Sequence, residues 1–153
     1  MANNRFRMIG YTGAELRVPW WGKLAFDISG IRTGNKMPAL REHKRDRAVG
    51  VIDKTARGQD GLTATGYFLE STRDGREVKA LIEEGFPFQA SIGVDFDAVE
   101  EVKEGKTASV NGAEFTGPGI IIRKSHVREI SFVSLGADDK TSVGIAATLP
   151  LCA

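Results

Sequence analysis

The segment GFPFQASIGV, residues 85–94, is where the sequence changes from a helical to an extended pattern. Gly85 is a typical helix stop, and Pro87 prevents the helix from continuing because its ring fixes φ and removes an amide donor. The run Gln89–Val99 then predicts a strand, since apolar residues alternate with small or polar ones. Ser91 lies on this strand, with Ala90 and Gly93 as small neighbours. This junction therefore predicts a helix followed directly by a strand that carries a serine.

The helix before this junction is predicted between Ser71 and Gly85. Ser71 or Thr72 can cap its first turn by accepting a hydrogen bond from a free amide. Its apolar residues recur at helical spacing and form one stripe, made of Val78, Leu81 and Ile82. We expect this stripe to pack against a sheet.

The rest of the chain has the pattern of a β-rich domain, with short apolar and β-branched runs separated by turns that draw on 18 glycines. Asn111-Gly112 lies between two runs that can pair, which is a strong hairpin signal. Gly30–Lys36 and Lys103–Lys106 are expected to be exposed loops. Further strands are predicted at Arg5–Ile9, Lys23–Ile28, Ala48–Asp53, Leu62–Leu69, Thr107–Val110, Glu114–Thr116, Ile120–Lys124 and Val127–Ser134.

Composition narrows the class of protein. The 153 residues are enough for one domain with a single core. The net charge of +1 gives no reason to expect a nucleic acid or a membrane surface as partner. Membrane spans and a signal peptide are not expected, because apolar runs are short and the N-terminus MANNRFRMIG lacks an apolar core. The single cysteine, Cys152, argues against a disulfide framework and a thiolate metal cluster, and we expect it to have no role.

The serine on the strand is a candidate for chemistry only if a base can activate it. Strand alternation places Ser91 on the face opposite the apolar residues Ala90, Ile92, Val94 and Phe96. The small residues beside it leave room for another chain to approach the backbone. Taken alone, Ser91 is more typical of a solvent-facing strand serine. The chain has two histidines that could act as its base, His43 in a charged segment and His126 in IIIRKSHVREISFV.

Other catalytic motifs are absent from the sequence. There is no G-x-S-x-G elbow, no H-E-x-x-H, no P-loop and no dinucleotide-binding glycine motif. Two histidines and one cysteine support a zinc site poorly, so no metal or cofactor is expected. A serine, histidine and acid constellation remains as the catalytic candidate.

Three segments, taken together, resemble the prohead proteases of tailed phages, which are capsid-maturation serine peptidases related in fold to herpesvirus assemblin. They are MPALREHKRDRAVGVIDK, GFPFQASIGVDF and VREISFVSLGADDKTSV, and they span Met37–Val143 in that order. The resemblance implies a β-rich α+β fold, a single-domain β-barrel with one or a few flanking helices. It implies Ser91 as the nucleophile and His43 as the general base.

The resemblance leaves two candidates for the third member of the triad. Glu129, in the REISFVS segment, matches the acid of the prohead proteases, whereas assemblin-like enzymes use a second histidine, which makes His126 a rival. In a regular strand, positions 126 and 129 point to opposite faces. We favour Glu129, because a carboxylate stabilises the imidazolium that forms on His43.

The function implied is proteolysis during capsid maturation, through a covalent acyl-enzyme. The expected substrates are the scaffold protein or the scaffolding segment of the major capsid protein, together with the protease's own tail. The expected location is the immature prohead in the host cytoplasm. An inert β-barrel module that binds capsid or scaffold without cutting is the alternative.

We expect residues 1–146 to form the protease domain and residues 147–153 to form a C-terminal tail. Assemblin-like proteases favour a small residue before the cut, so Ala153 fits an end left by self-processing. An engineered boundary fits equally well.

Overall fold

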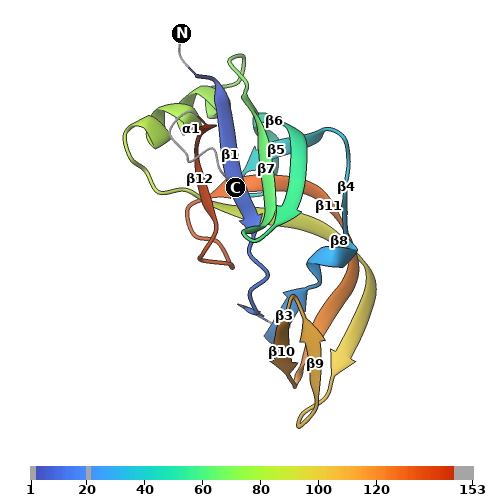
Figure 1. Cartoon of the computed structure of the whole chain (residues 1–153). Coiled ribbons are helices and arrows are strands. Elements are labelled where there is room, and N and C mark those ends of the chain that lie inside the picture. Colours follow the sequence, from blue (N-terminus) through green and yellow to red (C-terminus); the bar gives the residue numbers. More distant parts are fainter. Residues whose placement is uncertain (1–2, 20–21, 147–153) are drawn as a thin grey trace.

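The computed structural model describes residues 3–19 and 22–146. They form a strand-rich sheet that curls into a half-barrel with one α-helix, as the sequence predicted (Figure 1). The tail 147–153, including Cys152 and Ala153, lies outside the described residues. The described residues include no helix long and apolar enough to cross a membrane.

Twelve strands, one short 3-10 helix and one α-helix follow one another along the described chain. Their bounds are β1 Arg5–Tyr11, β2 Leu16–Val18, β3 Gly22–Phe26, η1 Ile28–Gly30, β4 Ile31–Thr33, β5 Met37–Arg41, β6 Lys44–Gly58, β7 Gly61–Phe68, α1 Arg73–Glu83, β8 Gln89–Val102, β9 Thr107–Val110, β10 Ala113–Thr116, β11 Gly119–Val133 and β12 Ser142–Ile145.

The long strand β11 organises the sheet. On one edge it pairs in parallel with β3, β4 and β5 in turn, and on the other it pairs with β8, antiparallel along nearly its whole length. The main path of the sheet runs β12-β1-β7-β6-β5-β11-β3-β2, while β9 and β10 form a separate hairpin. In Figure 1, this hairpin and β3 lie at one end of the molecule, and α1 lies at the other.

The helix begins and ends through the devices that the sequence predicted. The Thr72 hydroxyl caps its start by accepting a hydrogen bond of 3.0 Å from the Gly75 amide. Gly85 follows its end with a φ of +94°, a conformation that glycine adopts at little cost. Val78 is fully buried, and Leu81 and Ile82 pack against the main core.

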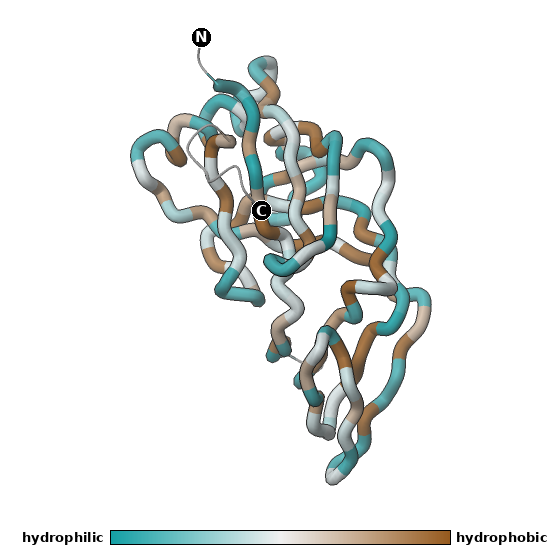
Figure 2. The backbone as a smooth tube through the Cα atoms, viewed as in Figure 1, coloured by the Kyte–Doolittle hydropathy of each residue, from teal (hydrophilic) through white to brown (hydrophobic). Residues whose placement is uncertain are grey.

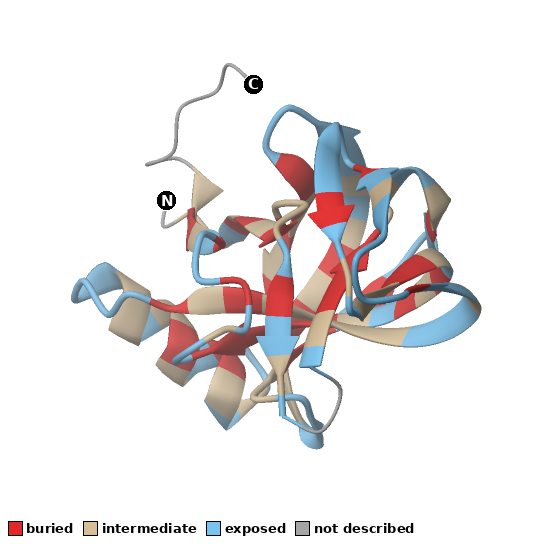
Figure 3. Ribbon diagram, turned by 90° about the horizontal axis from the view of Figure 1, so that it is seen from below, coloured by how far each residue is buried: buried red, intermediate tan, exposed pale blue. Residues whose placement is uncertain are grey.

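The core lies inside the curl of the sheet. Apolar residues alternate with polar ones along the strands, and the buried residues gather in the middle of the strands, away from the loops (Figures 2 and 3). Four aromatic rings, with centroids 5.1 to 6.1 Å apart in contacting pairs, form its centre: Phe6, Phe68, Phe88 and Phe132. Phe88 and Phe132 anchor the start of β8 and the end of β11, which lie side by side.

Several elements differ from the sequence predictions. Ile120–Lys124 and Val127–Ser134 are not two strands but parts of the single strand β11. The predicted loop Gly30–Lys36 contains the short strand β4, because Ile31 is buried and this segment pairs with β11. The strands β2, β5 and β12 were not predicted, and two of them are only three or four residues long.

Candidate active site

Three residues from distant parts of the chain meet at the surface of the sheet. The His43 Nε2 atom lies 2.9 Å from Ser91 Oγ, and His43 Nδ1 lies 2.6 Å from Glu129 Oε2. Ser91 comes from β8, Glu129 from β11, and His43 from the turn between β5 and β6. The sequence named all three as candidates, and the fold brings them into hydrogen-bonding distance.

The two hydrogen bonds of His43 determine how its ring is protonated. An ionised carboxylate only accepts hydrogen bonds, so the neutral ring carries its proton on Nδ1 and donates it to Glu129. The Nε2 atom is then free to accept the hydroxyl hydrogen of Ser91. The hydrogen bond to Glu129 raises the pKa of His43 above its usual value, although partial burial opposes this. The arrangement leaves a basic nitrogen directed at the serine hydroxyl.

His43 lies in a strained two-residue turn. Arg41 and Lys44 pair across the β5–β6 hairpin, and Glu42 and His43 between them have φ values of +54° and +58°. This is the backbone of a type I′ turn, which usually contains Asn-Gly because other residues are disfavoured at positive φ. Tertiary contacts must therefore hold the turn in place.

Ser131 supplies one of these contacts and joins the turn to the carboxylate. Its hydroxyl accepts a hydrogen bond of 3.0 Å from the His43 amide and donates one of 2.6 Å to Glu129 Oε1. Ser131 is fully buried, so its hydroxyl has no access to bulk water. With Oε1 bound to Ser131, the Oε2 atom of Glu129 faces the His43 ring. One hydroxyl thus fixes both the backbone of His43 and the orientation of Glu129.

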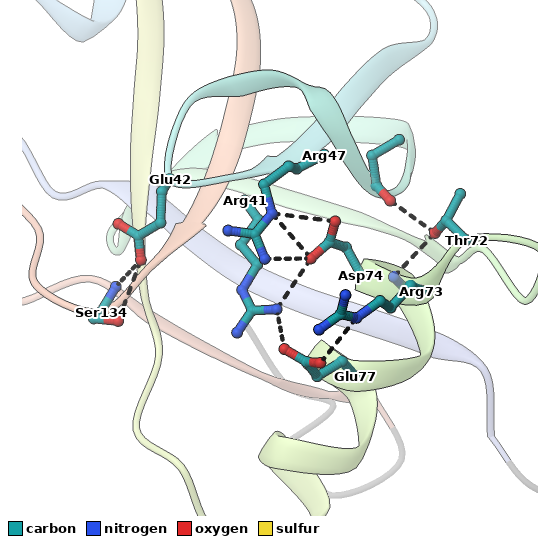
Figure 4. Close-up of polar contacts among 10 residues, drawn as sticks. Arg41, Glu42, Arg47, Thr72, Arg73, Asp74, Glu77 and Ser134 are labelled. Atoms are coloured by element: carbon teal, nitrogen blue, oxygen red, sulfur yellow. Dashed lines mark hydrogen bonds and ion pairs between the residues drawn. The ribbon is translucent and has the colours of Figure 1, made fainter.

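Glu42 holds the other half of the turn against the end of β11. Its amide donates to the Phe132 carbonyl at 3.0 Å. Its carboxylate accepts the Ser134 amide at 2.9 Å and the Ser134 hydroxyl at 3.2 Å, as Figure 4 shows. The turn that carries His43 is therefore hydrogen-bonded to the same strand that carries Glu129.

The helix braces the hairpin on either side of the turn (Figure 4). Asp74, in the first turn of α1, accepts hydrogen bonds from Arg41 on β5 at 3.0 Å and from Arg47 on β6 at 2.6 Å. These guanidinium groups lower the pKa of Asp74, the bond to Arg47 contributing most. Glu77, one turn later, also bonds Arg41. The helix thereby ties together the two strands that flank His43.

A β-bulge in β11 decides where Glu129 points. Val127 pairs with Val94 and Glu129 with Gly93, so Arg128 is an extra residue without a counterpart on β8. The extra residue puts Glu129 on the same face as Ser91. The expectation that positions 126 and 129 point to opposite faces is therefore wrong, because it assumed a regular strand.

The bulge also places the rival third member, His126, on the same face of the sheet as Glu129. It pairs with Asp95 on β8, four residues from Ser91. The His126 ring makes no hydrogen bond to any described residue, and the described partners of the His43 ring are Ser91 and Glu129. The fold brings Glu129 to His43 and leaves His126 outside this hydrogen-bonded group.

Gly93 makes room for the carboxylate of Glu129. A Cβ atom at this position would lie 2.1 Å from Glu129 Oε2, which is far closer than atoms can approach. The sequence suggested that the small residues beside Ser91 leave space for another chain, but Glu129 fills the space at Gly93. The sequence pointed to Gly93 for a different reason, and it did not identify the site residues Ser131, Glu42 and Ser134. The available signal for Ser131 was its spacing of two residues from Glu129 on one strand.

Two clefts flank Ser91. One, of about 430 Å³, lies between β8 and the β2–β3 hairpin and includes Ser91 in its wall. The other, of about 640 Å³, includes His43 and Glu129, with the charged residues Arg45 and Arg128 at its walls. Among the described residues, no group of three or more His, Cys, Asp or Glu side chains is placed to bind a metal ion.

Comparisons with known proteins agree with this geometry. A search of curated protein sequences finds no match. Among solved structures, the chain is similar to the protease of Kaposi's sarcoma-associated herpesvirus in complex with an allosteric inhibitor, with a TM-score of 0.50 and 13% identity over 95% of this chain and 81% of that one. At this identity the likeness shows the fold alone, an assemblin-like one. The family model of the caudovirus prohead serine proteases matches residues 23–149. The chain therefore belongs to the caudovirus prohead serine proteases and is a serine peptidase of capsid maturation.

Proposed function

We propose that Ser91 is the nucleophile of this peptidase, His43 its general base and Glu129 the third member of the triad. The observation that supports this assignment is the continuous pair of hydrogen bonds, 2.9 Å from Ser91 Oγ to His43 Nε2 and 2.6 Å from His43 Nδ1 to Glu129 Oε2. Nucleophile, base and orienting acid are each within the reach that acyl transfer requires.

The reaction follows from these roles. His43 Nε2 takes the hydroxyl proton as Ser91 Oγ bonds to the substrate carbonyl carbon. When the tetrahedral intermediate collapses, the C–N bond breaks and His43 gives the proton to the leaving amine. Water then attacks the acyl-enzyme, with His43 again as base, and releases Ser91. Glu129 stabilises the charged form of the ring in both steps.

The substrate binds as an extended strand along the outer edge of β8. Among the described strands, β8 pairs only with β11, and no described strand pairs with its other edge at Ser91 and Ile92. At the start of β8, the Ala90 amide is already bonded, because it donates to the Thr141 hydroxyl at 3.0 Å. Ser91 is the next residue, so the edge that we propose for the substrate begins there. An unpaired strand edge binds extended peptides through main-chain hydrogen bonds. This mode of binding presents a peptide carbonyl directly beside Ser91.

The substrates are the scaffold protein or the scaffolding segment of the major capsid protein, and the protease cleaves its own tail. It acts within the immature prohead in the host cytoplasm. The family, which is named for the prohead, supports this assignment of substrates and location.

The experiment is Ser91→Ala, assayed for cleavage of the co-expressed scaffold and for reaction with a fluorophosphonate. We expect both activities to disappear while the circular dichroism spectrum is unchanged, because the substitution removes a single oxygen from the surface of the sheet. Ser109→Ala, at an exposed serine on β9, is the matched control and should keep both. Cleavage that persists in Ser91→Ala would refute the nucleophile assignment. A wild-type protein that binds the scaffold but neither cleaves it nor reacts would support an inert binding module instead.

A further inference from the structure

The smaller of the two clefts is an apolar pocket directly beside Ser91. It has a volume of about 430 Å³ and is lined by residues of β1, β2, β3 and β8, among others. One wall is β8, with Ser91, Ile92 and Val94, and the opposite wall is the β2–β3 hairpin, with Val18 and Leu24. Its β8 wall belongs to the strand along which we propose that the substrate lies.

The polar groups in the wall of this pocket already have partners. The Tyr11 hydroxyl donates to the Ala14 carbonyl at 2.6 Å and accepts from the Phe26 amide at 3.0 Å. The Asp138 carboxylate accepts the amide and the hydroxyl of Thr12, each at 2.7 Å. Apart from Ser91, the polar side chains of the described lining therefore already have partners, and the main-chain groups at the edge of β8 are left for the backbone of the substrate. An apolar ligand gains from burial there, whereas a charged one would lose its hydration without a partner.

The position of His43 decides which half of the substrate reaches this pocket. His43 must protonate the amine that leaves, so the leaving half lies toward His43. His43 lines the larger cleft, whereas Ser91 lines the apolar pocket. The pocket is thus on the side of the acyl half, the part that becomes bonded to Ser91.

We propose that this pocket binds a bulky apolar side chain of the substrate, such as leucine, methionine or phenylalanine, on the acyl side of the cleaved bond. This inference rests on the proposed role of Ser91. An alanine side chain would leave most of the volume unfilled, so the proposed preference departs from the small residue that assemblin-like proteases favour before the cut. Each added methylene buried in such a pocket improves binding, and one to three of them typically change the specificity constant tenfold or more.

The test uses peptidyl phosphonates that differ only in the residue next to phosphorus, which is alanine, leucine or phenylalanine. Each probe forms a covalent bond to an active serine, so the cleavage site need not be known. We expect the leucine or phenylalanine probe to inactivate the wild-type protein at least tenfold faster than the alanine probe. Val18→Phe fills the pocket from the wall opposite Ser91 and should reduce this ratio to about threefold or less. Thr107→Phe, at an exposed position on β9 in the separate β9–β10 hairpin, is the control and should keep the wild-type ratio.

The outcomes separate this proposal from the catalytic one. Equal rates for all probes, a preference for alanine, or an unchanged ratio in Val18→Phe would overturn the pocket proposal while leaving Ser91 as nucleophile. A wild-type protein that none of the probes modifies, or a Ser91→Ala variant modified as fast as wild type, would overturn the catalytic assignment and the pocket proposal with it.

Discussion

Two hairpins in this molecule turn on two residues of the same left-handed backbone but differ in sequence. Between β9 and β10 the turn is Asn111-Gly112, with φ values of +53° and +77°. Between β5 and β6 it is Glu42-His43, with +54° and +58°. The first pair of residues favours this backbone by itself. The second pair disfavours it, at a cost on the order of 1 kcal/mol or more per residue.

The difference shows what holds each turn. Asn111-Gly112 favours this backbone locally, and the Asn111 side chain adds tertiary support by donating to the Phe26 carbonyl at 2.7 Å and accepting from the Ile28 amide at 2.9 Å. Glu42-His43 is held by the end of β11, where Ser131, Phe132 and Ser134 each accept or donate a hydrogen bond to it. The strained turn carries the His43 ring, so we interpret the strain as the consequence of holding that ring between Ser91 and Glu129. Substitutions at the two turns and their supports should then separate activity from stability.

The largest effect on activity is expected at Glu129, whose carboxylate is hydrogen-bonded to the His43 ring of the strained turn. Glu129→Gln should lower the single-turnover cleavage rate by about 10³- to 10⁴-fold, because an amide neither holds the reactive tautomer reliably nor stabilises the imidazolium. His126→Ala should cost much less, since its ring is not bonded to His43. The reverse ranking would mean that His126 is the third member of the triad.

The pH profile of Glu129→Gln provides a second measurement. Glu129 raises the pKa of His43, and catalysis needs the neutral ring, so wild-type activity falls as the pH drops through this raised pKa. Without the carboxylate, the pKa of His43 moves down toward its ordinary value of about 6.5. The acidic limb of kcat/KM should therefore shift to lower pH in the variant. Conversely, the pairing of protonated His43 with Glu129 stabilises the fold at low pH and is lost as the pH rises through the raised pKa. An unchanged acidic limb would show that Glu129 does not act on His43.

The next largest effect on activity is expected at Gly93, because the Glu129 carboxylate lies directly over this residue. Gly93→Ala would put a Cβ atom 2.1 Å from Glu129 Oε2, so the carboxylate must move away from His43. A displacement of about 1 Å in such a site costs on the order of 10²-fold in rate. Gly58→Ala is the matched control, because an added Cβ there meets nothing within 4 Å. Wild-type kcat in Gly93→Ala would contradict the placement of Glu129.

A smaller effect is expected at Ser131, the buried hydroxyl that supports the turn. Ser131→Ala removes the bond to the His43 amide and the bond to Glu129, and should lower kcat by about tenfold or more with little change in KM. The unpaired His43 amide should also reduce the free energy of unfolding by about 1–3 kcal/mol. Ser125→Ala, on the same strand, is the control. Its buried hydroxyl has no partner among the described residues, so its removal should reduce neither quantity. Equal effects in the two variants would deny Ser131 a positioning role.

The same comparison explains how much of the structure could be predicted from the sequence. Asn111-Gly112 and the capped helix were predicted because their local sequence agrees with their backbone. The Glu42-His43 turn was not, because its conformation depends on hydrogen bonds to β11, 88 residues away in the case of Ser131. The short strand β4 escaped prediction for the same reason, since it pairs with β11 and has little pattern of its own.

The site followed the same rule. Ser91, His43 and Glu129 were named through resemblance, and the fold brings them into hydrogen-bonding distance, while their catalytic roles stay a prediction. The relation of Glu129 to His126 could not be derived by counting positions along the strand. A single extra residue, Arg128, reverses the alternation, and a bulge of this kind has no clear signature in the sequence.

The smallest effect on activity is expected at the relaxed turn. Gly112 has a φ of +77°, and an added Cβ would meet nothing within 4 Å, so the cost of Gly112→Ala is a backbone cost alone. An L-residue in this conformation should lower the free energy of unfolding by about 1–2 kcal/mol, measurable by urea denaturation. Cleavage should keep its wild-type kcat. None of the described hydrogen bonds among Ser91, His43 and Glu129 involves the β9–β10 hairpin, which forms a separate two-stranded sheet. Gly58→Ala again serves as control, since its φ is not positive and its Cβ is unobstructed. A fall in kcat with little loss of stability would mean that this hairpin also takes part in the reaction, and the contrast between the two turns would then fail.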